Sequence, residues 1–83
     1  MIKFKELVAS VFNVPVANLT LQSGPENLPE WDSLAHMGII TAIEQTYHMQ
    51  FTTSEILSVK TIADLITILE ERGVTFVDEA HSV

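Results

Sequence analysis

The sequence contains no cysteine, few basic residues and no apolar run long enough to cross a membrane. Without cysteine, neither a disulfide nor a thiolate metal site can form. Only four Lys and Arg stand against eleven Asp and Glu, which gives a net charge of −7 at pH 7. Nucleic acid is not expected as a partner, because phosphate backbones are bound through Lys and Arg. Basic protein surfaces are the expected partners, since opposite charge favours encounter.

The N-terminal stretch has some features of a signal peptide, with Lys3 and Lys5 ahead of an apolar run. Polar residues such as Glu6 and Ser10 interrupt that run, and its apolar residues fall at the spacing of a helix with one apolar face. We therefore predict a soluble, cytoplasmic monomer that does not insert into a membrane.

Hydrophobic residues make up 47% of the 83 residues, a proportion typical of one small folded domain. Their spacing predicts an all-α fold, a four-helix bundle with a short third helix and a long loop between the first two helices. The first helix is expected to end at Asn13, a plausible left-handed cap, and the loop to occupy residues 14–31. The second helix is expected to run from Ser33 to residue 47 or 48.

The long loop is unusual for so small a domain unless it is functional or pinned to the core. Three of its residues are spaced as apolar anchors, namely Leu19, Leu21 and Leu28. We therefore expect the leucines to hold the loop against the helices.

Capping signals mark the last two helices. Thr52 with Glu55, and Thr61 with Asp64, each form the sequence pattern of a capping box. Gly73 is expected to end the last helix in a left-handed conformation. The predicted centre of the core consists of Ile43, Leu65 and Ile66.

Residues 30–37, with the sequence Glu-Trp-Asp-Ser-Leu-Ala-His-Met, open the strongest helical pattern of the chain. Asp32 is a good N-cap residue, because its carboxylate can accept hydrogen bonds from the free amides of the first turn. Ser33 then lies at the positive end of the helix dipole. A phosphate esterified to its hydroxyl would stand where a helix best tolerates an anion. The stretch therefore suits a serine that carries a phosphodiester.

The motif Asp32-Ser33-Leu34, near the middle of a small acidic helical chain, resembles that of the acyl carrier proteins, which bear phosphopantetheine on the serine of an Asp-Ser-Leu motif. The resemblance covers most of the chain, in the order helix, long loop, motif helix, short helix and last helix. It implies an acyl carrier domain over residues 1–73, followed by a C-terminal tail, residues 74–83, that is expected to be flexible.

The resemblance further implies a function without catalysis. A phosphopantetheinyl transferase would attach the arm to Ser33 from coenzyme A, with Asp32 and Leu34 beside it. The thiol of the arm would hold an acyl or aminoacyl group as a thioester. The carrier would present this group to acyl-loading, synthase or transferase enzymes with basic docking surfaces.

The partner face implied by the resemblance lies on the second helix and consists of Leu34, Met37, Thr41 and Glu44. Leu34 and Met37 leave apolar groups beside the attachment serine, as a docking patch would; for Leu34, packing against the loop is an equal alternative. Central fatty-acid carriers display several carboxylates along this helix, whereas this chain has Ala35, His36, Gly38 and Thr41. With Trp31 directly before the Asp-Ser-Leu motif and His36 shortly after it, the chain more closely resembles stand-alone carriers of specialised fatty-acid, polyketide or related pathways.

Several alternatives remain at this stage. His36 and Trp31 either pack in the protein or contact the arm and its cargo. The chain as a whole could be a helical interaction module without a prosthetic group. A serine hydrolase is disfavoured, because Ser33 is not in a Gly-x-Ser-x-Gly turn. No metal site is expected, since His36, His48 and His81 share no ligand face.

Overall fold

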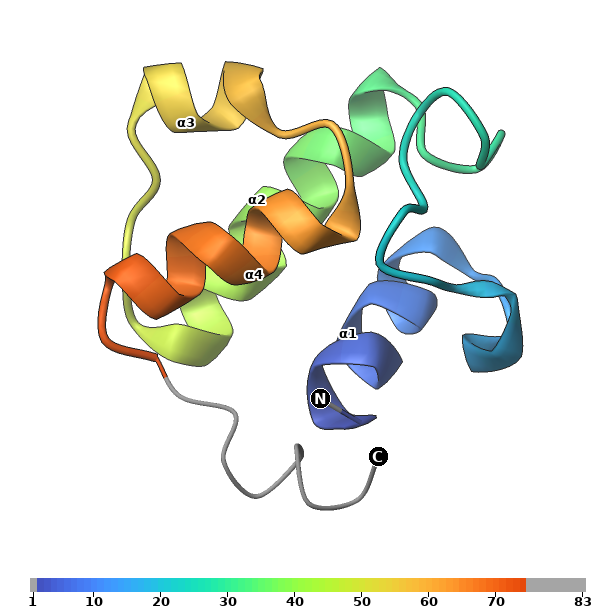
Figure 1. Cartoon of the computed structure of the whole chain (residues 1–83), viewed down its shortest axis with the longest axis horizontal. Helices are drawn as coiled ribbons and strands as arrows, with labels where there is room; N and C mark the ends of the chain where they lie inside the picture. Colours follow the sequence, from blue (N-terminus) through green and yellow to red (C-terminus); the bar gives the residue numbers. More distant parts are fainter. Residues whose placement is uncertain (1, 75–83) are drawn as a thin grey trace.

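The computed structural model describes residues 2–74, which form a helical bundle (Figure 1). Its four α-helices are α1 (Ile2–Phe12), α2 (Ser33–Tyr47), α3 (Thr53–Ser58) and α4 (Ile62–Glu71), and a 3-10 helix, η1 (Val16–Asn18), lies in the long loop between α1 and α2. No strand occurs among these residues. The predicted all-α fold, with its short third helix and long first loop, is confirmed.

One apolar core holds the helices together. Ile43 of α2 and Leu65 of α4 are 0% exposed and Ile66 is 8% exposed, so the predicted centre of the core is confirmed. The apolar faces of α1, α2 and α4 meet there through Phe4, Val8, Phe12, Ile39, Ile40 and Leu69. Burial of this apolar surface is the main favourable contribution to folding.

The long helices end in the left-handed conformation, at Asn13 (φ 58°), His48 (φ 53°) and Gly73 (φ 89°). After each, the next N–H donates to the carbonyl oxygen five residues earlier, over 3.0–3.2 Å. This is the Schellman arrangement, which satisfies carbonyl groups that the helix leaves free. Asn13 and Gly73 were predicted in this role, whereas His48 was expected only as an alternative helix end.

The long loop is attached to α4 through backbone as well as side chains. Leu19 and Leu28 are 3% and 8% exposed, as predicted for anchors. The same prediction for Leu21 is wrong, because its side chain is 47% exposed. Its carbonyl oxygen makes the attachment instead, since it accepts a hydrogen bond of 3.0 Å from the N–H of Ala63.

The start of α4 is capped from two sides. Thr61 Oγ1 accepts from the N–H of Asp64 at 3.3 Å, and the Asp64 carboxylate accepts from the N–H of Thr61 at 3.1 Å. This confirms the second predicted capping box. The N–H of Ile62 donates to the carbonyl oxygen of Ser23, in the loop, over 3.0 Å. The loop therefore supplies acceptors that the first turn of a helix lacks.

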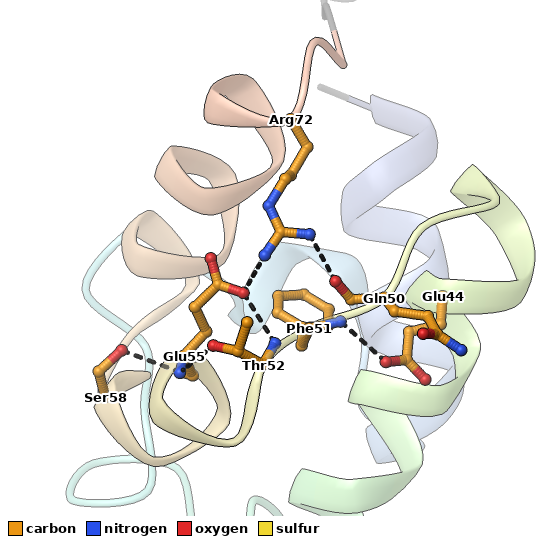
Figure 2. Close-up of polar contacts among 7 residues, drawn as sticks. All are labelled: Glu44, Gln50, Phe51, Thr52, Glu55, Ser58 and Arg72. Carbon is orange, nitrogen blue, oxygen red and sulfur yellow. Dashed lines mark hydrogen bonds and ion pairs between the residues drawn. The ribbon is translucent and has the colours of Figure 1, made fainter.

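Helix α3 is held at its N-terminal end by the first capping box (Figure 2). Thr52 Oγ1 accepts from the N–H of Glu55 at 3.1 Å, and Glu55 Oε1 accepts from the N–H of Thr52 at 2.9 Å. Arg72, just after α4, forms an ion pair with Glu55 and donates to the carbonyl oxygen of Gln50. These contacts fix α3 between the ends of α2 and α4.

Val74 is half-buried and packs against the core, and its N–H donates to the carbonyl oxygen of Leu69. Residues 75–83, the rest of the predicted tail, lie outside the described residues. Within residues 2–74, every helix falls short of the length and apolar character that crossing a bilayer requires.

Candidate functional site

Ser33 is the first residue of α2, and its side chain is exposed. Asp32 before it has extended backbone angles, and its Oδ1 accepts from the N–H of Ala35 at 2.8 Å, so the predicted N-cap is confirmed. The carbonyl oxygen of Asp32 accepts the next helical bond, from the N–H of His36 at 2.8 Å. The hydroxyl of Ser33 thus lies at the positive end of α2. A phosphodiester fits this position, both in exposure and in electrostatics.

Trp31 and His36 flank Ser33 in the sequence, and their side chains contact each other. Trp31 is 2% exposed, and its ring packs on that of Phe12, with 4.8 Å between ring centroids. Its Nε1 donates to Nδ1 of His36 over 2.9 Å, and Nε2 of His36 lies 2.9 Å from the carbonyl oxygen of Ile56. Both ring nitrogens of His36 are therefore bonded within the chain. Of the two roles considered for these residues, the structure shows packing.

Three apolar side chains are exposed on the first turns of α2 and on α3, whose Ile56 carbonyl oxygen lies 2.9 Å from Nε2 of His36. Leu34 is 84% exposed, so the alternative in which it packs against the loop is wrong. Met37 is 48% exposed, and Leu57 on α3 is 72% exposed. Leu57 was not predicted from the sequence. The signal for it is that Ile56 already packs α3 against the core, so a second large apolar residue in a six-residue helix has little room to be buried as well.

The polar residues of the predicted partner face differ from each other in their surroundings. Thr41 is exposed, whereas Glu44 is half-buried. Glu44 Oε2 accepts a hydrogen bond of 2.9 Å from the N–H of Phe51 (Figure 2). Glu44 is the sole acidic residue of α2, and this hydrogen bond engages it within the protein. The face therefore combines exposed apolar groups with little free negative charge.

The His, Asp and Glu side chains of residues 2–74 form no group that could hold a metal ion. The site thus consists of one exposed hydroxyl at a capped helix start, exposed apolar residues on the same helix, and a buried aromatic residue that precedes the serine by two positions. Such an arrangement can present a group attached to Ser33.

Comparison with known families gives a match over residues 3–69 to the family described as phosphopantetheine attachment site (PP-binding). The matched region extends from α1 into α4 and includes Ser33. A comparison with curated proteins gives no match. Members of the matched family are non-catalytic carriers that bear covalent phosphopantetheine and serve a phosphopantetheinyl transferase and pathway enzymes. The chain therefore belongs to the phosphopantetheine attachment site family of carrier proteins.

Proposed function

We propose that Ser33 is the residue of this carrier that bears the phosphopantetheine arm. The observation that supports this best is the position of Ser33, exposed and first in α2, after an Asp32 whose carboxylate caps the helix. Asp32 and Leu34 complete the motif on either side. The negative phosphodiester would be stabilised there by the helix dipole and by first-turn amides.

Attachment would form a bond between Ser33 Oγ and the phosphorus of the phosphopantetheine. The bond from that phosphorus to the nucleotide part of coenzyme A would break, and the hydroxyl proton would pass to the transferase. When bound, the arm supplies a thiol that holds an acyl or aminoacyl group as a thioester. The chain contains no cysteine, so this thiol is the one available for such chemistry.

The residues around Ser33 would hold and present the arm. Buried Trp31, packed on Phe12, keeps the loop before Ser33 in place. Leu34 and Met37, both exposed, offer apolar contacts to an enzyme that approaches Ser33. Interfaces gain most of their affinity from a few apolar side chains that become buried on binding, while charge steers encounter.

The partners we propose are enzymes of a specialised fatty-acid, polyketide or related pathway in the cytoplasm, which meet the carrier as a monomer through basic docking surfaces. The net charge of −7 favours basic surfaces. Thr41 and Glu44 would lie at the edge of the contact. Because Glu44 already accepts the Phe51 N–H, docking depends more on Leu34 and Met37 than on a series of carboxylates.

Two measurements test this function. The intact mass of the chain after co-expression with a broad-specificity transferase is expected to show one added arm per molecule. In an elongation assay, the loaded carrier is expected to be a poor substrate for a fatty-acid ketosynthase beside an ordinary fatty-acid carrier. Equal turnover of the two carriers would contradict the specialised pathway and leave the attachment unaffected.

A further inference from the structure

Helix α3 receives a hydrogen bond at its C-terminal end from His36 of α2. The carbonyl oxygen of Ile56 lies in the last turn of α3, where helical carbonyl groups lack intrahelical donors. Nε2 of His36 lies 2.9 Å from it. The indole of Trp31 can only donate, so Nδ1 of His36 is the acceptor and the proton of the neutral ring is on Nε2. We call this chain of two hydrogen bonds, Trp31 to His36 to Ile56, the His36 bridge.

Helix α3 depends on contacts from outside itself. Its six residues are far fewer than an isolated helix needs for stability, and none of them is fully buried. Its N-terminal end is held by Thr52 and by the ion pair between Glu55 and Arg72 (Figure 2). At its C-terminal end, the His36 bridge connects it to α2.

Two residues of the His36 bridge, Trp31 and His36, lie on either side of Ser33 in the sequence. Trp31 precedes Ser33 by two residues and His36 follows it by three. The two rings of the bridge are stacked, with centroids 6.1 Å apart and planes inclined by 28°. The loop before Ser33 and the first turn after it are thus both joined to α3.

We propose that His36 is a positioning residue for the modification of Ser33, acting through the hydrogen bond that its Nε2–H donates to Ile56. This inference rests on the proposed function of Ser33. The bond keeps α3 at a fixed place beside the start of α2. An enzyme that modifies Ser33 then meets both helices in one arrangement.

Leu57 is the group through which this arrangement reaches a partner. It directly follows Ile56, and it is 72% exposed. The bond at Ile56 therefore fixes the backbone from which Leu57 extends, relative to Leu34 and Met37 on α2. Without the bond, α3 would sample other positions, and fewer molecules would offer the three side chains together. The KM of the carrier for the transferase would rise, with little change in kcat.

Three variants at His36 separate the two hydrogen bonds. The amide of His36→Gln reaches about as far as Nε2, so it keeps a donor for Ile56. The shorter His36→Asn places its oxygen near Nδ1, so it keeps an acceptor for Trp31 alone. His36→Phe keeps an aromatic ring and removes both bonds. KM and kcat are measured for transfer of phosphopantetheine from coenzyme A to the full chain, after circular dichroism has shown that each variant is helical.

The KM of His36→Gln is expected to stay close to that of the wild type. His36→Asn and His36→Phe are expected to raise KM by about tenfold, with kcat changed by less than about twofold. A KM for His36→Asn that is no higher than that for His36→Gln would overturn the proposal. If His36 only packed, the loss of the donor to Ile56 would not raise the KM of His36→Asn above that of His36→Gln. If His36 only held Trp31, His36→Asn would have the lower KM of the two, because it keeps the acceptor for Trp31.

Nuclear magnetic resonance tests the bridge without any transferase. Trp31 is the single tryptophan, so its indole N–H gives one signal. We expect slow exchange of that proton and nitrogen shifts of His36 that show the Nε2–H tautomer. Protonation on Nδ1 in the neutral ring would overturn the proposal. A chain that shows the bridge but accepts no arm would refute the proposed function of Ser33, and the positioning role with it.

Discussion

Gly24 lies so close to Lys60 that a Cβ on Gly24 would stand 1.9 Å from the Lys60 carbonyl oxygen. The contact joins the backbone of the long loop to the residues that lead into α4. Beside it, the N–H of Ile62 donates to the carbonyl oxygen of Ser23 over 3.0 Å. The loop can be long in so small a domain because it forms part of the N-terminal cap of α4.

The replacement Gly24→Ala is therefore expected to destabilise the protein. The added methyl group would push the loop away from Lys60 and weaken the hydrogen bond at Ile62. We expect a loss of about 2–4 kcal/mol in the free energy of unfolding, measured by urea denaturation.

Gly38→Ala is the matched control for this variant. A Cβ at Gly38 would lie 3.6 Å from Cγ1 of Val11, which is an ordinary contact. Because alanine favours a helix interior over glycine, Gly38→Ala should stabilise the protein by about 0.5–1 kcal/mol. Equal effects of the two variants would contradict the close contact at Gly24.

Truncation of the core tests the packing of α2 on α4. Ile43 and Leu65 are 0% exposed, so Ile43→Ala or Leu65→Ala is expected to cost about 2–5 kcal/mol. Leu57→Ala, at a side chain that is 72% exposed, is expected to cost less than about 0.5 kcal/mol. Urea melts of the three variants give the comparison. A loss below about 1 kcal/mol for Leu65→Ala would show that the core lies elsewhere.

Signals that act within a few residues were readable from the sequence. Asp32 capping α2, Thr52 with Glu55, and Gly73 in its left-handed cap all depend on neighbours in the chain. The apolar spacing likewise predicted the buried faces, since a helix repeats every 3.6 residues.

Contacts between distant segments were not readable in this way. The bond from His36 to Ile56 exists because α3 packs beside the start of α2, which no local pattern specifies. Leu21 was expected to be buried, but its carbonyl oxygen holds the loop to Ala63 and leaves the side chain exposed. Backbone attachments of this kind leave no trace in residue type. The exposure of Leu57 also depends on how α3 is docked.

Acid is expected to weaken the attachment of α3. The pKa of Glu55 is lowered from its ordinary value of 4.5, chiefly because the Thr52 N–H donates to its carboxylate, with Arg72 adding to the effect. Since the pKa is lower in the folded state, this contribution to stability is complete above the unfolded value. It is lost as the pH falls through the folded value.

The comparison of the wild type with Glu55→Gln isolates this group, because the two proteins share all the other carboxylates. The wild type is expected to have the higher melting temperature at about pH 7, and the difference should shrink below about pH 4.5. Thermal melts followed by circular dichroism give both values. A difference that stays constant to about pH 3 would contradict the role of the Glu55 charge.

A charge on the apolar part of the partner face should disturb partner binding. Met37 is 48% exposed, and Met37→Glu would place a carboxylate where we expect apolar contact. The kcat/KM for transfer from a cognate acyl-loading enzyme is expected to fall by about tenfold or more. Glu44→Gln is the control, because its amide oxygen can still accept from the N–H of Phe51. A small, salt-sensitive change is expected for it, and a larger effect than that of Met37→Glu would contradict the apolar contact.

Attachment of phosphopantetheine to Ser33 is the claim on which the other functional predictions depend. The direct measurement is peptide mass mapping after co-expression with a broad-specificity phosphopantetheinyl transferase. Ser33→Ala is compared with Ser54→Ala, which removes another exposed serine from the first turn of a helix. We predict one arm on the peptide that contains Ser33, no arm on Ser33→Ala despite nearly unchanged helicity and melting, and full modification of Ser54→Ala. An arm that persists on Ser33→Ala would contradict the account.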